Sequence, residues 1–363
     1  MRLHLLGSMP FIAALLLGLT LSLAWAASSP IDDAYSTLNS QWNGTSELTA
    51  WGFVPVDAGF EGSLSSVGGP AVLLESGPSR QFAEADAVWI RALLAEGGLL
   101  IVADNFGSGN GLLKLLQLPV AFDGRLLTDS LFYRKQTVFP VSFDLPTSPY
   151  STGVNELVLD YATILNVTSQ ENVVVLASSS PFSFLDSNRN GEKDPEEPSG
   201  PFPVLIEVSM GKGSVILFTS PASFANGLIH EGDNGVLMEN IIRHASQPAR
   251  AAALLLDETH LEPSPFTPAK IFARGLVMSM VEGGMGLTGK LGLAILTISI
   301  LAVRFTVRRS NPETETGKPY RAARSFDTDT VMRLHPSWNR RRLDYVAHEL
   351  ETSMKWRHLH ERE

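Results

Sequence analysis

The segment GGLLIVADNFGSGNGLLKLLQL, residues 97–118, contains one complete strand–turn–helix unit. Its apolar run at 99–104 has no polar residue before Asp104, which is typical of a strand buried on both faces of a sheet. A glycine-rich turn follows, and GLLKLLQL then predicts a short helix. Because glycine is a favoured helix terminator, Gly97 and Gly98 mark the end of a helix in front of the strand.

The same alternation of apolar strands and helices continues on both sides of this segment. Helices are predicted within 79–98, where apolar residues recur at helical spacing, and at about 233–244. Further strands are predicted at 71–76, 172–179, 202–208, 213–220 and 251–258. Near-continuous Val, Ile and Leu strands that alternate with helices predict an α/β fold, with a mostly parallel sheet sandwiched by helices.

Binding sites in such sheets form at the carboxyl ends of the strands. This rule selects four stretches, at 75–78, 104–111, 219–224 and 257–260. From them we take six candidate pocket residues: Asp104, Asn105, Ser220, Asp257, Glu258 and His260. The turn at 104–111 could hold an anion on its backbone N–H groups, although it lacks the spacing of a dinucleotide fingerprint. The sequence DETH at 257–260 offers two carboxylates and an imidazole, which could bind metal, exchange protons or form only a polar rim.

A calcium loop is predicted at 186–197, within an insertion at 184–204. The sequence DSNRNGEKDPEE fits the spacing of oxygen ligands around calcium, and Gly191 stands where the loop must bend sharply. The predicted ligands are Asp186, Asn188, Asn190, Glu192, Asp194 and Glu197. Pro195 and Pro198 exclude the usual exiting helix, so we expect a structural loop of modest affinity. The alternative is a solvated acidic turn.

The two ends of the chain predict a membrane protein. Residues 1–26 have the pattern of a secretory signal peptide, with an uncleaved signal anchor as the alternative. The apolar run at 285–303 is long enough for a transmembrane helix. Three arginines follow directly, at positions 304, 308 and 309, and basic residues beside a span mark its cytoplasmic side. We therefore expect residues 27–260 to form an extracytoplasmic domain at the cell membrane.

The charge distribution agrees with this predicted topology. From Arg304 onward the chain has 13 Lys and Arg and 9 Asp and Glu, so the net charge of this tail is about +4. Because the whole chain has a net charge of −10, residues 1–303 carry about −14. A Pro-containing linker and juxtamembrane helix are predicted at 261–284, and an amphipathic helix at about 338–360 could bind membrane lipid or a partner. No feature predicts nucleic-acid binding. The absence of cysteine excludes thiol nucleophiles and disulfides.

Several motifs resemble a known family. SFLDSNRNGEKDPEEPSGPFPV (183–204), GKGSVILFTSPASFANGLIHEGDNG (211–235) and DETH look like the family called domain of unknown function 4350, over roughly residues 40–305. The resemblance implies a class I glutamine-amidotransferase-like, flavodoxin-like sandwich, a membrane anchor, and partners that include envelope-complex membrane proteins and a cytoplasmic AAA-class ATPase. The cysteine of an amidotransferase is missing, so a thiolate glutaminase is excluded.

These features together predict a membrane-anchored extracytoplasmic protein that binds a ligand or a partner within an envelope complex. One alternative is a cysteine-independent hydrolase that uses Asp257, Glu258 and His260. Another is a purely structural subunit of the envelope.

Overall fold

The computed structural model describes residues 17–56, 71–246 and 252–282. The predicted signal peptide lies partly outside these ranges. The predicted membrane span and cytoplasmic tail lie wholly outside them.

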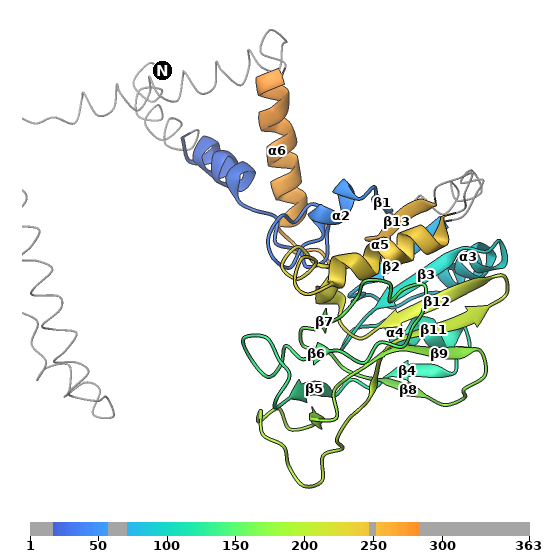
Figure 1. Cartoon of the computed structure of the whole chain (residues 1–363). Coiled ribbons are helices and arrows are strands. Elements are labelled where there is room, and N and C mark those ends of the chain that lie inside the picture. Colours follow the sequence, from blue (N-terminus) through green and yellow to red (C-terminus); the bar gives the residue numbers. More distant parts are fainter. Residues whose placement is uncertain (1–16, 57–70, 247–251, 283–363) are drawn as a thin grey trace, which may run out of the picture. The chain divides into compact units, whose positions relative to one another are not determined.

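A seven-stranded sheet forms the centre of the molecule (Figure 1). Its order is β1 (Val54–Val56), β13 (Ala253–Asp257), β2 (Ala71–Ser76), β3 (Leu99–Ala103), β12 (Gly213–Phe218), β11 (Pro203–Met210) and β9 (Val173–Ser178). The first five strands run parallel, and β11 is antiparallel to both of its neighbours. The mostly parallel α/β sheet predicted from the sequence is therefore confirmed.

Helices cover both faces of this sheet. On one face, α3 (Glu84–Ala95) and α4 (Gly109–Leu115) pack against side chains such as Leu73 and Leu100. On the other face, α5 (Asn234–Ala245) packs against side chains such as Leu74 and Ile101. Successive strand residues point to opposite faces, so a strand between two helical layers must be apolar at every position. This requirement explains the unbroken apolar runs of the sequence.

Three two-stranded ribbons between α4 and β11 were not predicted. They pair β4 (Val120–Phe122) with β8 (Leu165–Val167), β5 (Leu126–Asp129) with β10 (Ser183–Asp186), and β6 (Val141–Ser142) with β7 (Leu157–Val158). Strands of two to four residues are too short to leave a recognisable alternation of apolar and polar side chains, so no sequence pattern marked them.

Shorter elements complete the described chain. A helical turn, α2 (Ser46–Ala50), precedes β1, and a 3₁₀ turn, η3 (Pro221–Phe224), follows β12. After β13 the chain enters α6 (Thr267–Glu282), which lies within the segment 261–284 where a juxtamembrane helix was predicted, and Pro268 stands in its first turn. No helix of the described ranges combines the length and the apolar character needed to cross a membrane.

Candidate functional site

Two buried carboxylates lie side by side at the carboxyl ends of neighbouring strands. Leu74 of β2 pairs with Leu256 of β13, so the residues that follow, Glu75 and Asp257, are also neighbours. Both side chains belong to the face that α3 covers, because alternation places them with Leu73. Only 1% of Glu75 and 3% of Asp257 is exposed to solvent. Two carboxylates in such a position need a counter-charge or a proton.

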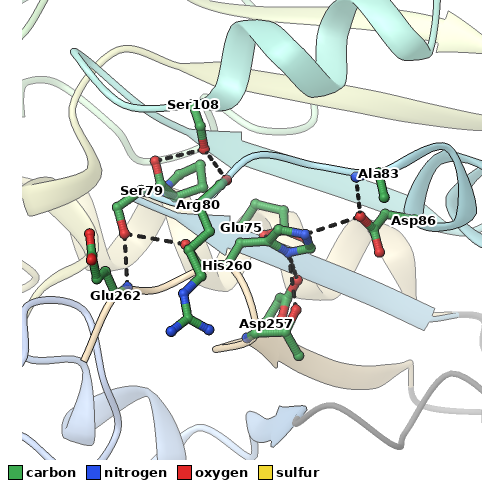
Figure 2. A network of polar contacts seen from close by, with 11 residues as sticks. Glu75, Ser79, Arg80, Ala83, Asp86, Ser108, Asp257, His260 and Glu262 are labelled. Carbon is green, nitrogen blue, oxygen red and sulfur yellow. Dashed lines mark hydrogen bonds and ion pairs between the residues drawn. The ribbon is translucent and has the colours of Figure 1, made fainter. Parts of the chain in front are cut away.

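His260 supplies part of that counter-charge from the turn after β13. Its backbone carbonyl accepts hydrogen bonds from the N–H groups of Ser79 and Arg80, each 2.9 Å long, and these bonds hold the turn in place. Its ring stacks on Phe82, with 3.8 Å between the ring centroids and an interplanar angle of 21°. The imidazole therefore has a fixed position (Figure 2).

Carboxylates bind the imidazole at both of its nitrogen atoms. Nδ1 lies 2.6 Å from Oδ2 of Asp257, and Nε2 lies 3.2 Å from Oδ2 of Asp86. Figure 2 shows these two carboxylates at opposite edges of the ring. Asp86 stands in the first turn of α3, where it also accepts the N–H of Ala83 at the start of the helix. Glu75 completes the cluster, with Oε2 at 4.0 Å from Nδ1.

The charges of the cluster influence one another. Burial, followed by the charge of Asp257, raises the pKa of Glu75 well above its usual range. Burial also acts to raise the pKa of Asp257, but hydrogen bonds led by the one from His260 outweigh it and lower that pKa. Burial opposes the charged form of His260, yet Asp257 and Asp86 outweigh it and raise its pKa. The proton is therefore held between Asp257 and His260, and Glu75 favours its neutral form.

This arrangement suits cation binding better than proton transfer to a substrate. A histidine base needs one ring nitrogen free to face a nucleophile or water, and Asp86 occupies Nε2 of His260. By contrast, one ligand atom each from Glu75, Asp257 and His260 lies within 4.8 Å of the others, close enough to share a metal ion.

The other predicted pocket residues serve separate local networks. Glu258 turns away from His260 and binds the N–H of Thr37 and the hydroxyl of Ser36. The carboxylate of Asp104 accepts the N–H groups of Asn105, Gly107 and Gly109 at the start of α4. The turn that could have held an anion is thus capped by a side chain of its own chain.

Asn105 and Ser220 also bind locally. Asn105 donates to the carbonyl of Tyr161, and the hydroxyl of Ser220 accepts the N–H of Asp160. Of the six residues selected from the sequence, the structure therefore brings together Asp257 and His260. The strand-end rule selected the stretch 75–78, but Glu75 was not carried into the six candidates, although it is the one charged residue of the strand at 71–76. Asp86 gave no signal, since acidic residues are common in a first helical turn.

The predicted calcium loop folds tightly around its two terminal carboxylates. Asp186 accepts the N–H groups of Asn190, at 3.1 Å, and Gly191, at 2.8 Å, while Gly191 has a φ of +78°. Glu197 accepts the N–H groups of Ser187 and Asp194. Asp186 and Glu197 are buried.

The remaining predicted ligands lie nearer the surface. The amides of Asn188 and Asn190 both donate to Oδ2 of Asp194, at 2.7 and 3.2 Å. Glu192 is exposed, and its backbone N–H donates to the side chain of Asn190. The loop thus brings five of its six candidate side chains into one hydrogen-bonded group.

An exposed aromatic patch includes the residue that precedes β10, the strand that leads into this loop. We define the patch as Phe132, Phe143 and Phe182, whose exposed fractions are 37%, 49% and 54%. The ring of Phe132 contacts the other two, with centroid distances of 5.5 Å to Phe143 and 5.9 Å to Phe182. The hydroxyl of Ser130, just after β5, donates to the carbonyl of Phe182, just before β10, and this bond links the two segments.

Comparison with known proteins places the chain in a family. The model of the family Domain of unknown function (DUF4350) matches residues 37–242, which is more than half of the chain. The chain therefore belongs to this family, as its motifs predicted. None of the curated proteins compared with it matches.

Solved structures show more distant likeness. The mmIFT52 N-terminal domain is 15% identical with a TM-score of 0.41, and the match covers 51% of this chain and 80% of that domain. Cytoplasmic protein STM1381 from Salmonella typhimurium LT2 is 18% identical with a TM-score of 0.31, over 45% of this chain and 61% of that one. The β-galactosidase of Bacillus circulans sp. alkalophilus is 16% identical with a TM-score of 0.29, over 47% and 22%.

Proposed function

We propose that the chain is a membrane-anchored, extracytoplasmic binding module of an envelope complex, and that its aromatic patch docks a partner protein. The body would be a class I glutamine-amidotransferase-like sandwich that has lost the thiol chemistry of that class. The exposed contact among Phe132, Phe143 and Phe182 is the observation that carries this proposal. Contiguous apolar patches are rare on monomeric surfaces and mark interaction sites.

The chemistry of the patch favours a protein partner over a lipid surface. Phenylalanine and tyrosine are enriched in the cores of protein interfaces, which a polar rim surrounds. Tyr133, the next residue after Phe132, is exposed, and Arg134 beside it in the sequence pairs with Glu156 and would contribute to such a rim. Residues 1–303 carry a net charge of about −14, which repels the anionic lipids that attract basic proteins.

Calcium would stabilise the patch through β10, the strand that links Phe182 to the loop. Phe182 stands just before β10, and β10 ends at Asp186, the first predicted ligand. A calcium ion shared by Asp186 and Glu197 would fix both ends of the loop, as in extracellular modules of modest affinity. The cation would act as a structural element and not as a reactant.

The predicted membrane span and tail, which lie outside the described residues, would anchor the binding module at the membrane and set its orientation. The run at 285–303 would anchor it with the α/β body outside, and the tail at 304–363 would contact lipid or an AAA-class ATPase in the cytoplasm.

Photo-crosslinking in intact cells tests the patch. A benzophenone amino acid replaces Phe182 in the full-length chain, and the matched control carries it at Val88, which is 58% exposed on α3. We expect one discrete protein adduct from position 182 and none from position 88. The double substitution Phe132→Ser and Phe143→Ser should reduce that adduct at least tenfold. The melting temperature should fall by only a few degrees, because both rings are partly exposed and few contacts are lost. Adducts with lipid alone, or an adduct that survives the double substitution, would contradict the proposal.

A further inference from the structure

We propose that Glu75, Asp257 and His260 form a binding site for a divalent transition-metal ion such as Zn²⁺. The site joins β2, β13 and the start of α3, and the inference is independent of the aromatic patch and of the calcium loop. Two carboxylates and one imidazole are an established type of ligand set for zinc and related ions.

An unsatisfied atom inside the cluster is the first argument. Only 1% of Glu75 is exposed, and its buried Oε1 has no hydrogen-bond partner among the described residues. Buried polar atoms are nearly always paired, so an unpaired carboxylate oxygen requires an explanation. A metal ion bound beside Nδ1 of His260 would coordinate the carboxylate of Glu75, in place of the hydrogen bond that a protonated Glu75 shares with Asp257.

The orientation of the imidazole is the second argument. Metal-binding histidines usually donate their other ring N–H to a carboxylate, which fixes the tautomer and the ring direction. Asp86 occupies that position at Nε2, 3.2 Å away. Nδ1 is thereby directed toward Asp257 and Glu75, and stacking on Phe82 prevents the ring from turning.

The charge balance is the third argument. Three carboxylates, those of Glu75, Asp86 and Asp257, surround one imidazole. Within the described part of the chain no Lys or Arg forms an ion pair with any of them. A divalent cation would balance this excess of negative charge without requiring Glu75 to be protonated.

Metal binding requires a small rearrangement. Nδ1 of His260 and Oδ2 of Asp257 are 2.6 Å apart, as suits a shared proton. Two ligand atoms at roughly 2.0–2.2 Å from a tetrahedral zinc ion stand more than about 3 Å apart. The ion would thus take the place of the proton on Nδ1.

Cobalt spectroscopy of the full-length purified chain tests the site. The protein is stripped with a chelator, kept in excess Ca²⁺ so that the predicted calcium loop is saturated, and titrated with Co²⁺, whose visible absorption reports its ligands. We expect one equivalent of Co²⁺ to give visible bands, and one equivalent of Zn²⁺ to remove them. Glu75→Gln should abolish the bands, and Asp86→Asn should weaken binding about 10- to 100-fold, as for other outer-shell carboxylates.

Two controls separate loss of the site from loss of the fold. Metal-free Glu75→Gln should melt at the same temperature as the metal-free parent chain or higher, because an uncharged amide replaces a buried carboxyl. Asp186→Ala with Glu197→Ala should leave the cobalt bands unchanged. Absence of bands in the parent chain, or bands that persist in Glu75→Gln, would overturn the assignment.

Discussion

At the residue scale, the described part of the structure contains a second buried carboxylate oxygen without a hydrogen-bond partner, besides that of Glu75. The backbone N–H of Asp160 donates to the hydroxyl of Ser220. The residue is 8% exposed, and its Oδ1 has no hydrogen-bond partner within the described ranges. Burial raises the pKa of Asp160 to about 6. Because the folded protein holds this proton more tightly than the unfolded chain, the contribution to stability is complete below about pH 4. It is lost as the pH rises through about 6.

Asp160→Asn should therefore stabilise the protein at neutral pH and not in acid. We expect the free energy of unfolding of the variant to exceed that of the parent chain by about 2 kcal/mol at pH 7.5, and the difference to vanish near pH 4. Urea denaturation of both proteins between pH 4 and 8 measures it. Asp144→Asn, at an exposed loop aspartate, serves as the control and should show no such gain. A difference that is independent of pH would refute burial of the Asp160 charge as the cause.

The four residues at 257–260 show the limit of residue-level prediction. The sequence DETH drew attention to the end of β13, and Asp257 and His260 do form one site there. Glu258, their neighbour in sequence, binds Thr37 instead, since adjacent residues at a strand end point in opposite directions.

At the scale of single elements, the loop at 186–197 combines a local motif with buried ends. The spacing of oxygen atoms is a property of the sequence alone. The burial of Asp186 comes from the pairing of β10 with β5, which places Asp186 opposite Leu126. A buried carboxylate that already binds backbone N–H groups is preorganised for a cation, because little further ordering is needed.

Isothermal titration of the full-length chain with Ca²⁺ tests this loop. We expect saturable binding with an affinity of about 10⁻⁴–10⁻³ M, and its loss in the variant with Asp186→Ala and Glu197→Ala. Glu196→Ala is the matched control, because this exposed neighbour is not among the predicted ligands and should bind as the parent chain does. Unchanged binding in the double variant would show that the ligands were assigned wrongly.

At the scale of the whole molecule, the proposed topology depends on the arginines at 304, 308 and 309. Moving several positive charges across a bilayer is unfavourable, so they should hold the C-terminus inside. Protease added to intact cells should cut the α/β body and spare a tag fused after Glu363. Permeabilised cells, in which the tag is also digested, provide the control. Digestion of the tag in intact cells, with survival of the body, would reverse the orientation.

The same scale shows why the order of strands was not predictable. β13, near the end of the described chain, inserts between β1 and β2. Strand β3 pairs with β12, which lies more than a hundred residues further along the chain. Non-local pairing of this kind depends on which apolar surfaces fit together. Such fits leave no local pattern in the sequence.

The sequence alone determined the elements that burial on both faces imposes, namely the apolar strands at 71–76, 99–103 and 213–218, the helices between them and a mostly parallel sheet. It also determined the oxygen spacing of the loop at 186–197. Only the tertiary structure decided that Glu75, Asp86 and His260 meet, and that three distant phenylalanines share one surface. The physical reason is that periodicity records how each residue is buried, whereas its partners are set by strand order and register across the whole chain.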